Sequence, residues 1–209
     1  MLTVHHLGVS QSERIVWLCE ELEIPYELKL YKRAPLMAPP DYKALHPLGT
    51  APIITDGGLM MAESSAIVEY IVHTYGGGRL IPKPGTPLWT DYLFWFHFAN
   101  GSFLPALMRG MILKYAGVSA DHPLMHSTNA RRNALLDMVE KRLSAADYFA
   151  GAEFTAADIM SVFSFTTGQQ FMPLDLAQRP ATTRYLQRVS SRPAYRRAMT
   201  KAEPGVISV

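Results

Sequence analysis

A glycine- and proline-rich segment at residues 76–88, "GGGRLIPKPGTPL", constrains the fold more than any other part of this sequence. It holds four glycines and three prolines. Because glycine admits many backbone conformations and proline removes an amide donor, regular structure is not expected there. The hydrophobic patterns on its two sides have different periods. We therefore predict a linker at residues 78–88, a first domain at 1–77 and a second domain at 89–209.

The first domain alternates between strand and helix patterns. "LTVHH" and "YELKLY" indicate strands, and "SERIVWLCEELE" between them carries apolar residues at helical spacing. After "APPDYKALHPLG", which has room for one helical turn, "APIITD" and "LMMAE" flank a Gly-Gly turn as a hairpin does. A helix follows over about residues 64–75. The order βαβββα predicts an α/β domain with a small mixed sheet.

The second domain has the period of helices throughout. We expect helices at about residues 89–115, 127–148, 155–170, 178–190 and 193–202. One helix start is explicit, because "FTAADI" places Thr155 at an N-cap position and Asp158 three residues later, a variant of the capping box. The sequence therefore predicts an all-helical second half.

Composition and charge exclude several classes of protein. The chain has 209 residues, 48% of them apolar, and a formal charge of +2, and it has no run of about five or six like charges that would suit nucleic acid or a lipid surface. It has neither a leader pattern at its start nor about eighteen consecutive apolar residues, so we expect neither export nor a membrane span. The single cysteine, Cys19, excludes an internal disulfide and fits a reducing cytoplasm. The histidines have no metal-ligand spacing, and we expect no metal.

Taken together, the layout and several short motifs resemble the cytosolic glutathione transferase family, whose first half is thioredoxin-like. The motifs are a hydroxyl residue after the first strand, "APII" with a strand-opening proline, "ES" at 63–64 and "TAAD" at 155–158. "ERIVWLCEEL", "HPLGTAP" and "SSAIVEYI" look most like a bacterial and fungal, serine-type branch. The resemblance spans nearly the whole chain and implies a cytoplasmic homodimer that takes part in detoxification.

The resemblance also implies which residues bind glutathione. From the residues alone, Pro52 is a strand-start proline in the trans form, whereas the family's proline here is cis and turns the Ala51 backbone toward the cysteinyl part of the tripeptide. Glu63 and Ser64 would by themselves only cap a helix. In the family, the matching serine and its N–H bind the γ-glutamyl carboxylate, and the matching acid helps to hold the α-ammonium group.

The motifs leave several candidates for the group that holds the glycyl carboxylate. Thr50 stands where family members often carry a lysine before the strand-opening proline, so the sequence departs from the family pattern there. Lys43, His46 and Arg33 are the other candidates.

A serine hydroxyl is expected to stabilise the glutathione thiolate. A thiol with a pKa near 8.5 is only about 3% ionised at pH 7, and lowering that pKa by about two units takes about 2.7 kcal/mol. A helix dipole offers about 0.3 to 1 kcal/mol, whereas a hydrogen bond to a charged acceptor offers about 1.5 to 3 kcal/mol. The hydroxyl is therefore the larger contribution.

Two serines could supply that hydrogen bond. Ser10 comes immediately after the first strand and loop, as the family's hydroxyl does, and we prefer it; Ser12 is the alternate. Ser10 and Glu13 also have the spacing of a capping box, which is the structural role expected from the residues alone. Cys19, the nucleophile of a rival reductase mechanism, lies in the middle of the predicted helix and is expected to be a buried thiol.

The electrophile pocket should be lined by the first helix of the second domain. One face of that helix carries an apolar stripe, which in an ordinary protein would be core: Phe103, Leu104, Met108, Met111 and Tyr115. The resulting hypothesis is a glutathione transferase acting on small hydrophobic electrophiles. The alternatives are a glutathione-dependent peroxidase or dehalogenase and a non-catalytic glutathione-fold binding module.

Overall fold

The computed structural model describes residues 1–34 and 37–203, which form two compact units. Of these, residues 1–34, 37–81 and 189–203 make the first unit, and residues 82–188 make the second. The domain limits predicted from the sequence stay predictions. No helix in the described parts of the chain is both long and apolar enough to cross a membrane.

A four-stranded mixed sheet forms the centre of the first unit, as predicted. Its strands are β1 (Leu2–Leu7), β2 (Glu27–Tyr31), β3 (Ile53–Asp56) and β4 (Leu59–Ala62), in the order β2-β1-β3-β4. β1 runs parallel to β2 and antiparallel to β3, and β3 and β4 form the hairpin. Every residue of β1 is buried, which is typical of a central strand covered on both faces.

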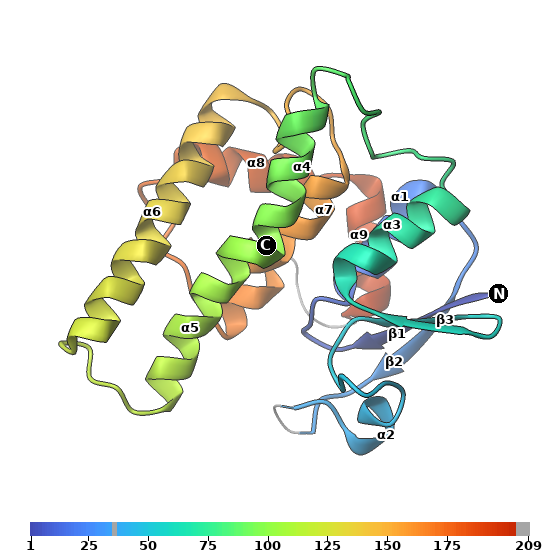
Figure 1. Ribbon diagram of the computed structural model, residues 1–209, viewed down its shortest axis with the longest axis horizontal. Helices are drawn as coiled ribbons and strands as arrows, with labels where there is room; N and C mark the ends of the chain where they lie inside the picture. Colours follow the sequence, from blue (N-terminus) through green and yellow to red (C-terminus); the bar gives the residue numbers. More distant parts are fainter. Residues whose placement is uncertain (35–36, 204–209) are drawn as a thin grey trace. The chain divides into compact units, whose positions relative to one another are not determined.

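Four helices cover this sheet and one another. They are α1 (Glu13–Leu22), α2 (Pro40–Lys43), α3 (Ser64–Thr74) and α9 (Pro193–Ala202). Figure 1 shows α1 and α3 on one face of the sheet and α2 on the other. Under α2, Tyr42 packs with Leu7 and Ile53 in a hydrophobic cluster that Ala51 also contacts. The thioredoxin-like arrangement expected from the sequence is therefore confirmed.

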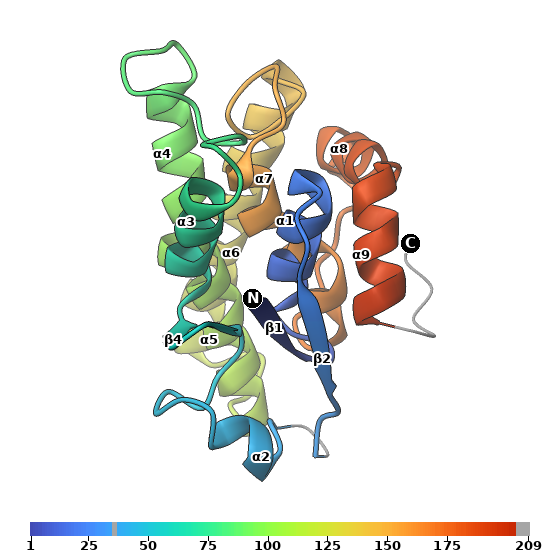
Figure 2. The ribbon, with the colours of Figure 1, turned by 90° about the vertical axis from the view of Figure 1, so that its right-hand side faces the viewer.

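Helix α9 packs against α1 (Figure 2), although the sequence analysis placed it in the second half. Trp17 meets Tyr195 edge to face, with ring centroids 5.0 Å apart. Glu21 accepts two hydrogen bonds from Arg192, and Glu20 pairs with two basic residues of α9. Acidic side chains on α1 and basic side chains on α9 and at its start thus hold α9 on α1.

The second unit is helical, as predicted. It contains α4 (Trp89–Phe98), a π-helical turn (Ala99–Phe103), α5 (Leu104–Tyr115), α6 (Pro123–Ala145), α7 (Ala156–Val162), 3-10 turns at Phe163–Phe165 and Thr167–Gln170, and α8 (Pro180–Ser190). The helix predicted at residues 89–115 is thus interrupted by the π turn. Phe103, in that turn, stacks between Phe98 and Phe165, so the interruption carries an aromatic side chain of the core.

The capping box predicted at Thr155 and Asp158 is confirmed. Thr155 Oγ accepts a hydrogen bond from the Ala157 N–H, and Asp158 accepts one from the Thr155 N–H at 2.9 Å. Asp158 also accepts hydrogen bonds from the Phe149 N–H and the Tyr185 hydroxyl. Burial raises the pKa of this carboxyl to about 6, although these hydrogen bonds oppose the shift.

Candidate functional site

The register of the sheet brings the predicted site segments to one edge. Ile53 of β3 pairs with His5 of β1 on one side and with Ala62 of β4 on the other. Because both pairings are antiparallel, the end of β1, the start of β3 and the end of β4 lie at the same edge. The segments that begin or end there are residues 8–12, 51–52 and 63–64.

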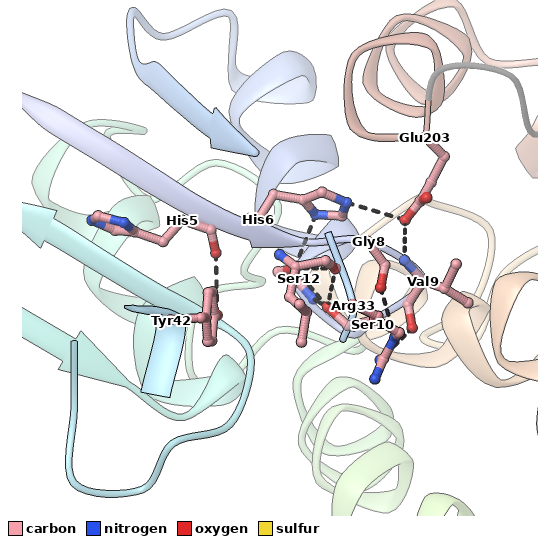
Figure 3. A network of polar contacts seen from close by, with 10 residues as sticks. His5, His6, Gly8, Val9, Ser10, Ser12, Arg33, Tyr42 and Glu203 are labelled. Atoms are coloured by element: carbon pink, nitrogen blue, oxygen red, sulfur yellow. Dashed lines mark hydrogen bonds and ion pairs between the residues drawn. The ribbon is translucent and has the colours of Figure 1, made fainter. Parts of the chain in front are cut away.

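The turn after β1 is held by charged side chains on two sides (Figure 3). Val9 has a φ of 52°, a left-handed conformation that is uncommon for a β-branched residue. Arg33 donates from Nε to the Gly8 carbonyl oxygen at 2.8 Å and from Nη2 to the Val9 carbonyl oxygen at 2.7 Å. The Val9 N–H donates to Glu203 Oε1. The strained turn is therefore fixed through both its donor and its acceptor groups.

Ser10 lies in this turn, with only 5% of its surface exposed. Its hydroxyl oxygen lies 2.6 Å from the Leu7 carbonyl oxygen, to which it donates, and 2.7 Å from Ser12 Oγ. It accepts a hydrogen bond from the Ser12 N–H at 3.2 Å. The Glu13 N–H donates instead to the Ser10 carbonyl oxygen, and Ser12 occupies the N-cap position of α1. The capping box predicted for Ser10 and Glu13 is therefore wrong, because the Ser10 side chain turns back toward β1.

Ser12 connects Ser10 to two residues that the sequence analysis did not select. Ser12 Oγ accepts from the Leu7 N–H at 3.0 Å and lies 2.9 Å from His6 Nδ1. The other ring nitrogen, His6 Nε2, lies 3.1 Å from Glu203 Oε1. Figure 3 shows the resulting chain of side chains from Ser10 through Ser12 and His6 to Glu203. All four side chains are buried.

The Ala51–Pro52 peptide bond is cis, as the family resemblance implied and as the residues alone did not. Pro52 is buried and Ala51 is half-buried, packed against the cluster of Leu7, Tyr42 and Ile53.

Glu63 and Ser64 begin helix α3. Glu63 is exposed at the N-cap position with a φ of 72°, and Ser64 is the first helical residue, 2% exposed. The first N–H groups of a helix have no partner within the helix and, together with the helix dipole, favour an anion. The pair is therefore placed where a carboxylate could bind.

A buried arginine links the start of α3 to the turn at residues 8–12, here called the serine turn. Arg14 of α1 is 1% exposed and donates from Nη1 to Gln11 Oε1 at 2.6 Å and to Ser64 Oγ at 3.3 Å. Burial lowers the pKa of the guanidinium to about 9, with Glu13 opposing the shift. The side chain is still charged at neutral pH, so it adds a positive charge behind Ser64.

The candidates for the glycyl carboxylate have different environments. Thr50 and Lys43 are exposed, and His46 is half-buried. His46 Nδ1 accepts a hydrogen bond from the Leu48 N–H at 3.2 Å, so the neutral ring carries its proton on Nε2. Arg33 is engaged with the carbonyl oxygens of the serine turn, which gives it a structural role near the site.

The five residues predicted to line an electrophile pocket differ in exposure. Phe103 and Leu104 are buried within the helical unit, Met111 is half-buried, and Met108 and Tyr115 are 39% and 70% exposed. Their assignment to a pocket stays a prediction.

Cys19 is fully buried in α1, as predicted, and burial raises the pKa of its thiol far above the usual range. Within residues 1–34 and 37–203, the structure brings no three His, Cys, Asp or Glu side chains together as a metal site would require.

Sequence reasoning missed His6, Arg14 and Glu203. Arg14 left a signal, since it is a charged residue followed directly by the apolar run "IVWLC" of a helix. Glu203 left none, because 197 residues separate it from its partner His6.

Comparison with known proteins assigns both halves of the chain to the same family. Residues 10–74 match the family described as glutathione S-transferase, N-terminal domain, and residues 103–193 match glutathione S-transferase, C-terminal domain. Glutathione S-transferase 3 of Schizosaccharomyces pombe is 34% identical over all of this chain and 91% of its own length. Glutathione S-transferase GstB of Escherichia coli is 28% identical over 91% of this chain and 93% of its own.

Solved structures have the same fold. A glutathione S-transferase from Actinobacillus pleuropneumoniae superposes with a TM-score of 0.88 at 33% identity, covering 97% of this chain and 93% of its own. A glutathione transferase from Phanerochaete chrysosporium, solved with oxidized glutathione, has a TM-score of 0.75 at 22% identity and covers 96% of this chain and 94% of its own. At that identity, the second likeness shows the fold alone.

Proposed function

The chain belongs to the cytosolic glutathione S-transferase family, and from this premise we propose that it activates glutathione with the hydroxyl of Ser10. The observation that carries the proposal is the common edge of the sheet. There, the buried Ser10 hydroxyl, the Ala51–Pro52 segment and the start of α3 come together. Each offers a group that one part of the tripeptide requires.

Three parts of the site would bind the three charged or polar parts of glutathione. Ser64 and the first N–H groups of α3 would bind the γ-glutamyl carboxylate, with the Arg14 charge behind them. Exposed Glu63 would hold the α-ammonium group, and the Ala51 backbone would pair with the cysteinyl residue. His46 would donate from Nε2–H to the glycyl carboxylate, because its Nδ1 accepts from the Leu48 N–H, with Thr50 as the alternative. The Phanerochaete chrysosporium protein of the same fold was solved with oxidized glutathione, which supports this use of the fold.

The Ser10 hydroxyl would act by donating one hydrogen bond to the sulfur anion. Its single proton points to the Leu7 carbonyl oxygen at 2.6 Å, so a rotation about the Cβ–Oγ bond would redirect it to a bound sulfur. Such a charge-assisted hydrogen bond is worth about 1.5 to 3 kcal/mol. The thiol proton leaves to solvent, and Ser10 itself stays protonated throughout.

The thiolate then attacks a small hydrophobic electrophile. Its lone pair forms the new carbon–sulfur bond. In a substitution, the leaving group departs with the electron pair of the broken bond; in a conjugate addition, the resulting carbanion takes up a proton from water. Peroxidase or dehalogenase chemistry would use the same thiolate. The Ser10 side chain does not cap α1, and its hydroxyl donates to the Leu7 carbonyl oxygen. This favours catalysis over a binding module, which has no use for a group that stabilises a thiolate. We also expect a homodimer, as in the family.

Turnover tests the proposal. The rate of glutathione conjugation to an activated nitroaryl chloride is measured for the wild type and Ser10→Ala, with glutathione affinity measured separately by calorimetry. We expect kcat to fall roughly 10- to 150-fold in Ser10→Ala, and the affinity to change by less than about twofold. Ser144→Ala, at an exposed serine of α6, is the matched control and should behave as the wild type. Unchanged kcat in Ser10→Ala would refute the role of Ser10.

A further inference from the structure

We propose that Glu203, His6 and Ser12 form a positioning chain that engages the Ser12 hydroxyl and leaves Ser10 as the donor to the glutathione sulfur. The proposal rests on the function proposed above and adds to it a choice between the two serines. It also gives the C-terminal segment a role in the site, because Glu203 follows α9 directly.

The direction of the hydrogen bonds starts at Glu203. One oxygen of this carboxylate, Oε1, accepts from the Val9 N–H and also lies 3.1 Å from His6 Nε2. A backbone N–H can only donate, so Oε1 is an acceptor there. The facing His6 Nε2 must then carry a proton and donate it. The carboxylate thus selects the form of the imidazole ring with hydrogen on Nε2.

The His6 ring with hydrogen on Nε2 determines which hydrogen bonds Ser12 makes. In the neutral ring, Nδ1 has a lone pair, and Ser12 Oγ at 2.9 Å donates its only proton to it. Ser12 Oγ also accepts from the Leu7 N–H. To reach a bound sulfur, Ser12 would have to give up its buried hydrogen bond to His6 Nδ1, and Ser10 its bond to the Leu7 carbonyl oxygen, which also lies 3.3 Å from Ser12 Oγ. Only the loss at Ser12 would interrupt the chain to Glu203.

A doubly protonated His6 leads to the same result. Its Nδ1–H would donate to Ser12 Oγ, and the Ser12 proton would turn to Ser10 Oγ, 2.7 Å away. Ser10 would then accept from Ser12 and donate its own proton outward. In this doubly protonated state the donors run in series from His6 through Ser12 to Ser10, and donors polarised in series strengthen one another.

Glu203 also fixes the position of Ser10 through the backbone. Val9, the residue before Ser10, has a left-handed φ of 52°, and Glu203 holds its N–H while Arg33 holds its carbonyl oxygen. Opposite charges therefore clamp the two sides of one peptide turn. A small displacement of a reacting group can cost much of the rate. These two contacts therefore help to keep the Ser10 hydroxyl within hydrogen-bond distance of the glutathione sulfur.

The experiment measures the pKa of the thiol of bound glutathione by ultraviolet thiolate absorbance, together with kcat and glutathione affinity. The variants are Glu203→Gln, Glu203→Ala, Ser12→Ala and the double variant Glu203→Ala with Ser12→Ala. Glu203→Gln keeps one oxygen acceptor, replaces the other oxygen by an NH2 group and removes the charge at nearly the same size. It therefore tests the chain even where the alanine variant disturbs folding.

Glu21→Gln is the matched control. Glu21 is as buried as Glu203, with 8% and 6% of the side chain exposed, and it also joins the α9 region to the first unit, through Arg192. Its hydrogen-bond partners, Trp17 and Arg192, lie outside the serine turn. A loss of helix docking would therefore affect both glutamine variants, whereas loss of the positioning chain would affect only Glu203→Gln.

We expect Glu203→Gln to lower kcat roughly twofold to threefold and to raise the bound-thiol pKa by about 0.3 to 0.5 units. Glu203→Ala and Ser12→Ala should each lower kcat about tenfold, with glutathione affinity within about twofold of the wild type. The double variant should be no worse than the poorer single variant, because the residues act as one chain. Glu21→Gln should match the wild type.

Two results would overturn the proposal. One is that both Glu203 variants keep the bound-thiol pKa and the kcat of the wild type. The other is that Ser12→Ala loses more of the shift in the thiol pKa than Ser10→Ala does, which would make Ser12 the donor. A wild type that does not lower the thiol pKa at all would instead refute the proposed function itself, so the two failures are distinguishable.

Discussion

Arg14 donates a hydrogen bond to Ser64 Oγ at 3.3 Å, so a buried guanidinium lies behind the hydroxyl that is proposed to hold the γ-glutamyl carboxylate. The same nitrogen of Arg14 also donates to Gln11, within the serine turn. One side chain therefore joins the two halves of the proposed glutathione site.

This relationship predicts that Arg14 acts mainly on binding. Replacing Arg14 by Met keeps the apolar stem and removes the charge and the hydrogen bonds to Gln11 and Ser64. We expect glutathione affinity to fall roughly 10-fold or more, because a hydrogen bond to a charged group is worth about 1.5 to 3 kcal/mol, while kcat at saturating glutathione changes less. Calorimetry and steady-state kinetics measure the two effects. Wild-type affinity in a folded Arg14→Met protein would contradict the prediction.

Asp158 predicts a pH dependence of stability. Its carboxyl has a folded pKa of about 6, against about 3.9 in an unfolded chain, so the folded state binds this proton more tightly. Its stabilising contribution is therefore full below about pH 4 and is lost as the pH rises through about 6. Asp158→Asn has no such proton.

We expect the wild type to lose up to about 3 kcal/mol relative to Asp158→Asn between about pH 4 and about pH 7. Urea unfolding of both proteins across this range measures the difference in their unfolding free energies. A difference that stays constant, or that grows in favour of the wild type, would show that burial does not dominate the pKa of this carboxyl.

Cys19 should be chemically silent in the folded protein. Burial raises the pKa of its thiol and leaves it no access to solvent, and the thiolate is the reactive form. A chromogenic disulfide reagent should label less than a tenth of the protein in the time in which it labels free glutathione completely, and label Cys19 fully after unfolding in urea. Cys19→Ala should retain glutathione conjugation. Rapid labelling of the native protein would reopen the reductase mechanism.

The C-terminal end of α1 is suboptimal for stability. Glu23 has a φ of 54° and its N–H donates to the Cys19 carbonyl oxygen, a left-handed helix end that favours glycine. Glu23→Gly should raise the unfolding free energy by about 0.5 to 1 kcal/mol. Glu69→Gly, in the exposed face of α3, is the control and should lower it by about 1 kcal/mol. A loss of stability in both variants would contradict the argument.

Local sequence patterns predicted helices and strands well where one signal, such as periodicity or a capping motif, dominated. The change of period identified the strands and helices of the first unit, and "FTAAD" identified a capping box that the structure contains. The expected helix at residues 193–202 is α9. Its packing on α1 was not predictable, because the pairs of Glu20 and Glu21 with α9 join residues about 170 or more positions apart.

Local sequence patterns predicted less of the candidate site than of the fold. Motif and family resemblance selected the serines, the cis proline and the start of α3, but periodicity could not show that Ser10 turns away from Glu13. His6 has the pattern of an ordinary strand residue, and its buried partner Glu203 comes from the other end of the chain. Such contacts are set by tertiary packing, which no local spacing reports.

The most direct test of the central claim is an ultraviolet titration of the thiol of bound glutathione in the wild type and in Ser10→Ala, with binding verified for both. We expect the wild type to lower this pKa by about one unit or more, and Ser10→Ala to lose most of the shift while still binding glutathione. A bound thiol with its ordinary pKa in the wild type, or a shift that survives intact in Ser10→Ala, would contradict this claim.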